Sequence, residues 1–298
     1  MTAEKLNRQV RMELTVLAEM NLISLEQREK IAERYPAKQW DLVTLIRWFS
    51  ILGAVAMGAG LIILSRHLTF QRTLIEAGLF LLSAGCVGGG LWAERRLHLP
   101  KVGAALQLLG AIVFQGLSLV LAIHYSTGFG NWPAVVGIDC VIFFLGAYLL
   151  RNRLLLIYAT ANFFVWFGGQ TGYVSGWGAY WLGMTYPLRF LLAGLASLGA
   201  AYLHLRYIPP DYRPFTRVYA HFGLSVIHLA LWFLALFGYF ELKVRWEGTE
   251  IERLLFSFLW AGVSLGCIFG ANPSGFQMLR GYGMTFLIVN LYTFYFNS

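Results

Sequence analysis

The chain has 298 residues, of which 58% are hydrophobic and only 13% are charged, and its mean hydropathy is +0.60. Soluble globular domains carry about 25% charged residues, so the composition excludes an ordinary soluble protein and is typical of a membrane protein. The formal net charge is +8, but the Lys and Arg residues lie mostly in the N-terminal tail and in loops. Because no basic patch is interleaved with aromatic residues on a soluble domain, we expect no nucleic-acid partner.

The N-terminal 44 residues are polar enough to lie outside the membrane. Apolar residues recur there at helical spacing, which predicts an amphipathic helix over residues 4–20. A helix this short needs its apolar face covered, because helix propensity alone contributes little. The face is expected to pack on the hairpin itself, on the membrane or on a protein partner. Its residues are Leu6, Val10, Leu14 and Leu17.

A second short helix is expected directly after the first, over residues 25–34. Ser24 followed by Gln27 fits a capping box, in which the hydroxyl and the Gln side chain each bond to a backbone amide of the other residue. Pro36 ends the helix, because the residue before a proline is pushed out of the helical region. The two helices predict a cytoplasmic hairpin over 1–44, followed by a membrane domain over 45–298.

The membrane domain consists of apolar segments separated by short polar loops. About 20 apolar residues are needed to cross a hydrocarbon core about 30 Å thick. We therefore predict an all-α fold, a polytopic transmembrane helical bundle of about nine spans. The spans are expected at 45–65, 74–92, 102–124, 132–150, 154–169, 188–206, 219–240, 254–270 and 279–296.

Small residues four apart predict close helix contacts in lipid, as in the pairs Gly85/Gly89 and Ala196/Ala200. We expect these contacts within one bundle, with a homo-oligomer as the lesser alternative. The stretch 168–186 is uncharged and rich in Gly, Trp and Tyr. It is expected to form an aromatic belt at the head-group level, or alternatively a re-entrant lid over the bundle.

Lys and Arg are divided unevenly between the two sides of the predicted membrane domain. Roughly three-quarters of the 23 Lys and Arg residues lie on the same side as the N-terminus. Because cytoplasmic loops carry an excess of Lys and Arg, we expect the N-terminus in the cytoplasm and the C-terminus outside.

Asp139 is the carboxylate that lies deepest inside an apolar segment. Ionisable groups at such depth are costly, so they are usually paired or functional. Arg189 is the expected partner and His124 the alternative, while a structural hydrogen bond to a neighbouring helix would explain Asp139 equally well. With three further polar residues, the candidate intramembrane polar site comprises Asp139, Arg189, His124, Gln115, Asn162 and His228.

Motifs for enzymatic chemistry are absent from the sequence. It has no Walker loop, H-E-x-x-H or C-x-x-C, and its one G-x-S-x-G match, at 262–266, lies inside the expected span 254–270 and not at a strand-to-helix elbow. We therefore expect no enzyme, no cofactor and no metal site. His221 and His228 are about 10 Å apart along one helix, which is too far to ligate one metal ion. A bis-histidine site of His204 and His221 is a lesser alternative. The cysteines lie inside apolar runs and are expected to act as buried hydrophobic residues: Cys86, Cys140 and Cys267.

Three motifs carry a resemblance to a known family. They are Leu-x-x-Met-Asn-Leu-Ile-Ser-Leu-Glu-Gln at 17–27, Tyr-Leu-Leu-Arg-Asn-Arg at 148–153 and Asn-Leu-Tyr-Thr-Phe-Tyr-Phe at 290–296. They resemble a bacterial family of predicted membrane proteins of unknown function, in which a helical hairpin reading Gly-Leu-Ile-Ser-x-Glu-Gln precedes a polytopic region. Asn21 replaces the usual Gly, and the last motif lacks the usual Arg between its tyrosines. The resemblance implies a helical hairpin followed by a polytopic bundle, located in a bacterial inner membrane. It implies no activity.

Two functions from different classes fit these features. The first is a non-enzymatic accessory or scaffold protein whose N-terminal hairpin docks a protein partner. The second is a transporter or channel for a small solute or ion, with Asp139 in its path. We expect the scaffold function, because a single acidic residue deep in the membrane is weak support for a coupled transporter and no inverted repeat is evident. An enzyme acting on a lipid or glycan through the aromatic outer loop has the least support.

Overall fold

The fold is seen in a computed structural model, which describes residues 10, 12–18, 20, 22–33, 35, 72–125, 131–176, 181–238, 250–274 and 276–297. Contacts divide the chain into two compact units, Met1–Gly53 and Ala54–Ser298. Within the described residues the regular elements are helices, accompanied by one isolated bridge between Trp181 and Met184. The predicted all-α fold is confirmed.

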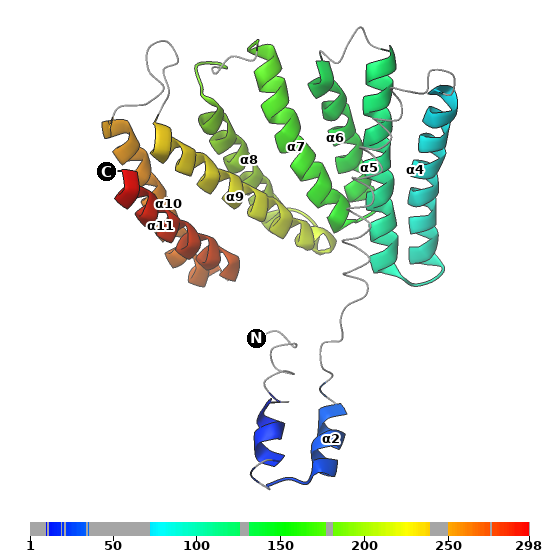
Figure 1. Cartoon of the computed structure of the whole chain (residues 1–298), viewed down its shortest axis with the longest axis vertical. Helices are drawn as coiled ribbons and strands as arrows, with labels where there is room; N and C mark the ends of the chain where they lie inside the picture. Colours follow the sequence, from blue (N-terminus) through cyan, green and yellow to red (C-terminus); the bar gives the residue numbers. More distant parts are fainter. Residues whose placement is uncertain are drawn as a thin grey trace. The chain divides into compact units, whose positions relative to one another are not determined.

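The first unit contains a helical segment over 12–18 and helix α2 (Leu25–Glu33) (Figure 1). The capping box at the start of α2 is confirmed, because the Ser24 amide donates to Gln27 Oε1 at 2.9 Å and the Gln27 amide donates to Ser24 Oγ at 3.1 Å. These bonds satisfy backbone donors that a helix start otherwise leaves free.

The described part of the second unit contains eight long helices. Their positions match eight of the nine predicted spans, and the first predicted span, 45–65, lies outside the described residues. Six of these helices are long and apolar enough to cross a membrane, whereas α7 and α11 are less apolar, so a count of nine is not confirmed. The helices are α4 (Arg72–Arg95), α5 (Pro100–Tyr125), α6 (Trp132–Leu149), α7 (Arg153–Val174), α8 (Tyr186–Arg206), α9 (Arg213–Phe237), α10 (Glu250–Ser274) and α11 (Gln277–Asn297).

These helices form a row of hairpins in chain order (Figure 1). The most extensive contacts join α4 to α5, α6 to α7, α8 to α9 and α10 to α11. The second helix of each hairpin then packs against the next hairpin, so α5 contacts α6 and α7, α7 contacts α8 and α9, and α9 contacts α10 and α11. The bundle is thus assembled from contacts between elements that are close in sequence.

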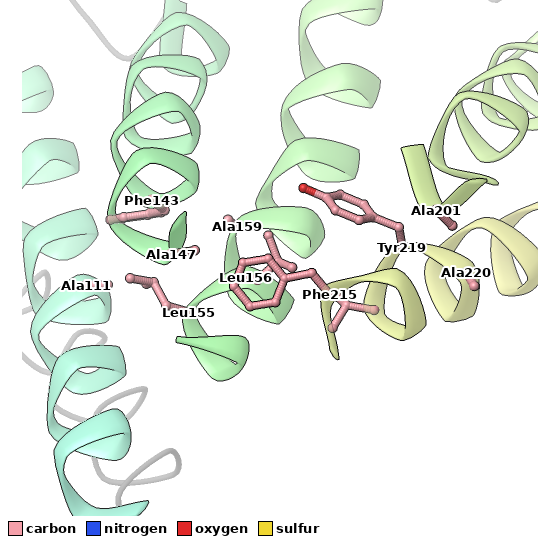
Figure 2. Packing of buried hydrophobic residues seen from close by; sticks show 11 residues of the cluster. Ala111, Phe143, Ala147, Leu155, Leu156, Ala159, Ala201, Phe215, Tyr219 and Ala220 are labelled. Atoms are coloured by element: carbon pink, nitrogen blue, oxygen red, sulfur yellow. The ribbon is translucent and has the colours of Figure 1, made fainter. Parts of the chain in front are cut away.

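Helix α7 lies at the centre of the largest apolar core (Figure 2). Leu156 and Ala159 of α7 are fully buried, with Ala147 of α6 on one side and Phe215 of α9 on the other. Asn152 begins α7, since its side-chain oxygen accepts hydrogen bonds from the amides of residues 154 and 155. The cap fixes where α7 starts, and the core fixes which face it buries.

Helix α7 extends to Val174, five residues beyond the expected span 154–169 and into the uncharged stretch 168–186. Gly168 and Gly169 are helical, and each provides room for an aromatic ring. A Cβ at Gly169 would lie 2.5 Å from the Trp132 ring of α6, and one at Gly168 would lie 2.9 Å from the Phe190 ring of α8. These two glycines of the stretch 168–186 therefore serve close packing between helices.

Close backbone contacts occur at glycines other than the predicted ones. A Cβ at Gly90 would lie 2.7 Å from the carbonyl oxygen of Gly103, and a Cβ at Gly103 would lie 2.6 Å from that of Gly90. A Cβ added at Gly85 or Gly89 meets nothing within 4 Å in the described part of the chain, and Ala196 is exposed, so those pairs are not the contact points found here. The small-residue pattern indicated close packing but not which face of α4 meets α5.

Replacing Gly103 with Ala is expected to destabilise the α4–α5 hairpin, because the new methyl group meets a backbone oxygen that has no freedom to rotate away. Overpacking of this kind costs about 1–3 kcal/mol. Gly116→Ala on the same helix is the matched control, since its Cβ meets nothing within 4 Å and Ala favours helix. Thermal unfolding in detergent measures both variants, and equal midpoints would contradict the predicted contact.

Candidate functional site

Helix α5 carries polar side chains at several levels along its length. Gln107, Gln115, Ser118 and His124 each bond to a neighbouring helix. From Gln107 to His124 the helix rises about 25 Å at about 1.5 Å per residue, which is most of a hydrocarbon core. The described polar contacts of α5 therefore run from one end of its span to the other.

The middle level holds Asp139, whose side chain projects from α6 and is 1% exposed. Ser118 Oγ lies 2.5 Å from Asp139 Oδ2 and 2.9 Å from the backbone oxygen of Gln115. A serine hydroxyl has one proton to donate. Both contacts are hydrogen bonds at once only when Asp139 carries a proton and donates it to Ser118. When Asp139 is ionised, Ser118 turns its proton to the carboxylate, and the Gln115 carbonyl loses the hydrogen bond from Ser118 but keeps its place in the helix ladder.

The same level extends from α5 to α7. Gln115 Nε2 donates to Asn162 Oδ1 at 2.6 Å, and the Tyr158 hydroxyl donates to Gln115 Oε1. Asn162 Nδ2 in turn donates to the backbone oxygen of Tyr158 at 3.0 Å. Through the Ser118 contact to the Gln115 backbone, this chain continues to Asp139. We call this set the central polar network, and it comprises Ser118, Asp139, Gln115, Tyr158 and Asn162.

A second polar contact joins α4, α5 and the start of α7. It lies at the tight-turn end of these helices, where short turns connect α4 to α5 and α6 to α7. Gln107 Nε2 donates to Glu94 Oε2 at 3.3 Å, and Asn152 Nδ2 donates to Gln107 Oε1 at 2.8 Å. Asn152 also caps α7, so one side chain fixes both the helix start and its position against α5. Glu94 is exposed while Gln107 is buried. This level therefore connects a surface carboxylate to the interior.

A third polar contact lies at the opposite end of α4 and α5. His124 Nδ1 is 2.8 Å from Glu76 Oε1, and both side chains are 11% exposed. The Tyr125 hydroxyl donates to the other carboxylate oxygen at 3.1 Å. His124 therefore contacts Glu76 and not Asp139. The sequence interpretation missed Glu76 because it stands three residues into its expected span, where a carboxylate is easily taken for a helix-end residue.

Arg189 is not the partner of Asp139, which corrects the predicted ion pair. Its Nε donates to the backbone oxygen of Met184 at 2.9 Å, and its guanidinium lies 4.5 Å from the centre of the Tyr186 ring. The physical reason is the order of the helices, because α7 lies between α6 and α8 in the row. The side chain in hydrogen-bond contact with Asp139 is Ser118 instead.

His228 belongs to a different part of the row. It is fully buried on α9, accepts a hydrogen bond from Trp260 Nε1 at 3.1 Å and stacks on Phe286 at 4.5 Å between ring centres. These contacts are with α10 and α11, so His228 does not extend the central polar network. The structure places it in helix packing.

The two histidines of the lesser metal alternative have separate partners. The Tyr148 hydroxyl bonds to His204 Nε2 at 2.6 Å, whereas His221 Nδ1 lies 3.2 Å from the Tyr282 hydroxyl. Among the described residues, no three His, Cys, Asp or Glu side chains form a metal-binding group. His204 instead joins α8 to α6, since Tyr148 projects from α6.

The predicted partner-binding stripe is largely covered in the described part of the hairpin. Leu14 is 7% exposed, Val10 and Leu17 are half-buried, and Leu6 lies outside the described residues. The exposed apolar side chains of the 12–20 segment are a different set: Met12, Val16 and Met20. Leu14 is therefore buried, so the leucine stripe is less available to a partner than Met12, Val16 and Met20.

The comparisons with known proteins bear on the N-terminal half of the chain. Residues 16–156 match the model of a family described as "Predicted membrane protein (DUF2157)". The match extends from the hairpin to the start of α7, and it therefore includes Asp139 and Ser118 but not Tyr158 or Asn162. No curated protein and no solved structure matches the chain. With several apolar helices and this similarity, the protein is a membrane protein, similar over just under half of its length to a family of unknown function.

Proposed function

We propose that the protein is a transporter or channel that moves protons or a small cation across the membrane, with Asp139 as the ion-binding carboxyl group. The observation that carries this proposal is the contact between Asp139 and Ser118 in a site that is 1% exposed. Ionisable groups at membrane depth usually mark ion pathways or proton relays. The hydrogen bonds at Ser118 accommodate the acid and its conjugate base, which a proton-binding site requires.

The polar levels of α5 support a path along this helix. Each polar level of α5 carries one carboxyl group from a neighbouring helix. Glu94 bonds to Gln107 at the first level, Asp139 to Ser118 at the second and Glu76 to His124 at the third. Successive levels are separated by about 16 Å and about 9 Å along the helix axis. One hydrogen bond spans about 3 Å, so the proposed passage requires water to enter or helices to shift. Such helix movements occur in about microseconds to milliseconds.

The proposed orientation puts the N-terminus in the cytoplasm. In the described part of the second unit, Arg72, Arg189 and Arg253 lie at the long-loop ends of the helices. Because successive helices alternate in direction, the tight turns inside the hairpins lie together at the end of the bundle opposite the long loops. Positive charge near the tight turns supports a cytoplasmic location for that end. The residues near the tight turns are Arg95, Arg96, Lys101, Arg151, Arg153, Arg206, Arg213, Arg217 and Arg280.

Asp139→Asn is expected to lower pH-driven flux at least ten-fold, because an amide keeps a hydrogen bond to Ser118 but cannot bind and release a proton at neutral pH. The measurement is proton or cation flux in reconstituted vesicles with an imposed pH difference. Asp211→Asn is the matched control, since its exposed carboxylate pairs with Arg151 outside the network. Full flux from Asp139→Asn, or no flux from the unmodified protein, would remove the transport proposal.

The orientation is tested by thiol labelling in a background without the native cysteines. Cysteine at Leu182 should react with an impermeant reagent added outside the cell, because this exposed residue lies on a long loop. Cysteines at Leu97 and Tyr207 should react only after the membrane is opened, since both are exposed at tight turns. The reverse pattern would invert the proposed topology.

A second proposal is that the hairpin docks a soluble partner, with the protein acting as a non-enzymatic scaffold. The exposed Met12, Val16 and Met20 support it, because a flexible methionine-containing helix face suits the apolar groove of a partner protein. The surface differs from the leucine stripe expected from the sequence. It ranks second because Leu14 is already covered.

A photo-crosslinking residue at Val16 is expected to capture a soluble protein in living cells, because this side chain is exposed on the apolar face. The same residue at exposed Glu29 of α2 is the control. Adducts of equal yield at both positions, or lipid adducts alone at Val16, would count against partner docking.

A further inference from the structure

A cavity lies between the long-loop ends of α9, α10 and α11, away from the central polar network. Its volume is about 180 Å³, which is smaller than the roughly 300–1,000 Å³ of pockets for drug-sized ligands. It therefore suits a small polar group. Its lining residues are Ala235 of α9, Glu250, Arg253, Leu254 and Ser257 of α10, and Thr293 and Phe294 of α11.

Three polar side chains of α10 share one face toward this cavity. Glu250, Arg253 and Ser257 follow at intervals of three and four residues, which brings them to the same side of a helix. Arg253 is half-buried, and among the described residues it makes no hydrogen bond or ion pair. A partly desolvated guanidinium without a partner favours an anion, and phosphate oxygens match its planar donors.

The hydroxyl groups of the cavity divide into a donor and an acceptor. Thr293 Oγ1 accepts from Trp232 Nε1 at 3.1 Å, so its own proton is available to a ligand. Ser257 Oγ donates to Asn290 Oδ1 at 3.0 Å, so its lone pairs are available instead. Among the described lining residues, the cavity thus offers donors at Arg253 and Thr293 and acceptors at Ser257 and the Glu250 carboxylate.

From this arrangement we infer that the cavity binds a phosphoethanolamine group, with phosphate at Arg253 and Thr293 and the ammonium at Glu250 and Ser257. The site lies where the span Glu250–Asn272 begins, which is the depth of phospholipid head groups. Exposed Leu254 and Phe294 at the rim provide an apolar surface for acyl chains. The chemistry is shared by a phospholipid head group and by free phosphoethanolamine.

The test is native mass spectrometry of the full chain in detergent with phosphatidylethanolamine, phosphatidylglycerol or free phosphoethanolamine. Arg253→Gln should weaken binding of phosphatidylethanolamine at least ten-fold, whereas Arg280→Gln, at the tight-turn end of the same hairpin, should leave it unchanged. Thr293→Val keeps the side-chain shape and should also weaken binding. Binding of phosphatidylethanolamine but not of free phosphoethanolamine would identify the ligand as a lipid head group. Binding of both would show that the free compound is also a ligand.

Two outcomes would overturn the inference. Equal binding by the unmodified protein and by both cavity variants, each folded, would show that the cavity is not the site. Equal affinity for phosphatidylglycerol would show that Glu250 and Ser257 recognise no ammonium group. Glu250→Gln separates these elements, since it should weaken phosphatidylethanolamine binding and leave phosphatidylglycerol binding unchanged.

Discussion

The structure depends on one constraint, that polar groups inside a membrane must find partners within the protein. Helix α5 meets it by bonding to α4, α6 and α7 at successive levels. Interhelical hydrogen bonds in membranes contribute only about 0.6 kcal/mol each on average, so no single bond holds the row together. Their combined effect, with the close approach at Gly90 and Gly103, fixes the register of neighbouring helices.

The features predictable from sequence were those set by local patterns. Helix type and position followed from apolar length, and the Ser24–Gln27 capping box followed from spacing alone. Gln115 and Asn162 were predicted near Asp139 because polar residues inside spans tend to meet. Their actual link, through Ser118 and Tyr158, was missed because hydroxyl residues are common in spans and carry no charge.

The errors came from features that depend on helix order and rotation. Arg189 and Asp139 both stand in the first half of their helices, but position along a helix does not say that α7 lies between α6 and α8. Likewise, the spacing of Leu14 predicted an apolar face but not how much of it would be buried. Gly85 and Gly90 differ by five residues, and only the partner helix decides which of them lies at the contact.

The presence of Asp rather than Asn at position 139 bears on the proposed proton binding. If the central polar network only held α5 to α6, an amide at 139 would bond to Ser118 as well and would carry no cost of ionisation at membrane depth. The network has neutral amides at Gln115 and Asn162, where only a hydrogen bond is needed. A carboxyl group is the member that exists in two protonation states, and its hydroxyl neighbour is able to accept from one and donate to the other. The arrangement therefore favours proton binding as the reason for the acid.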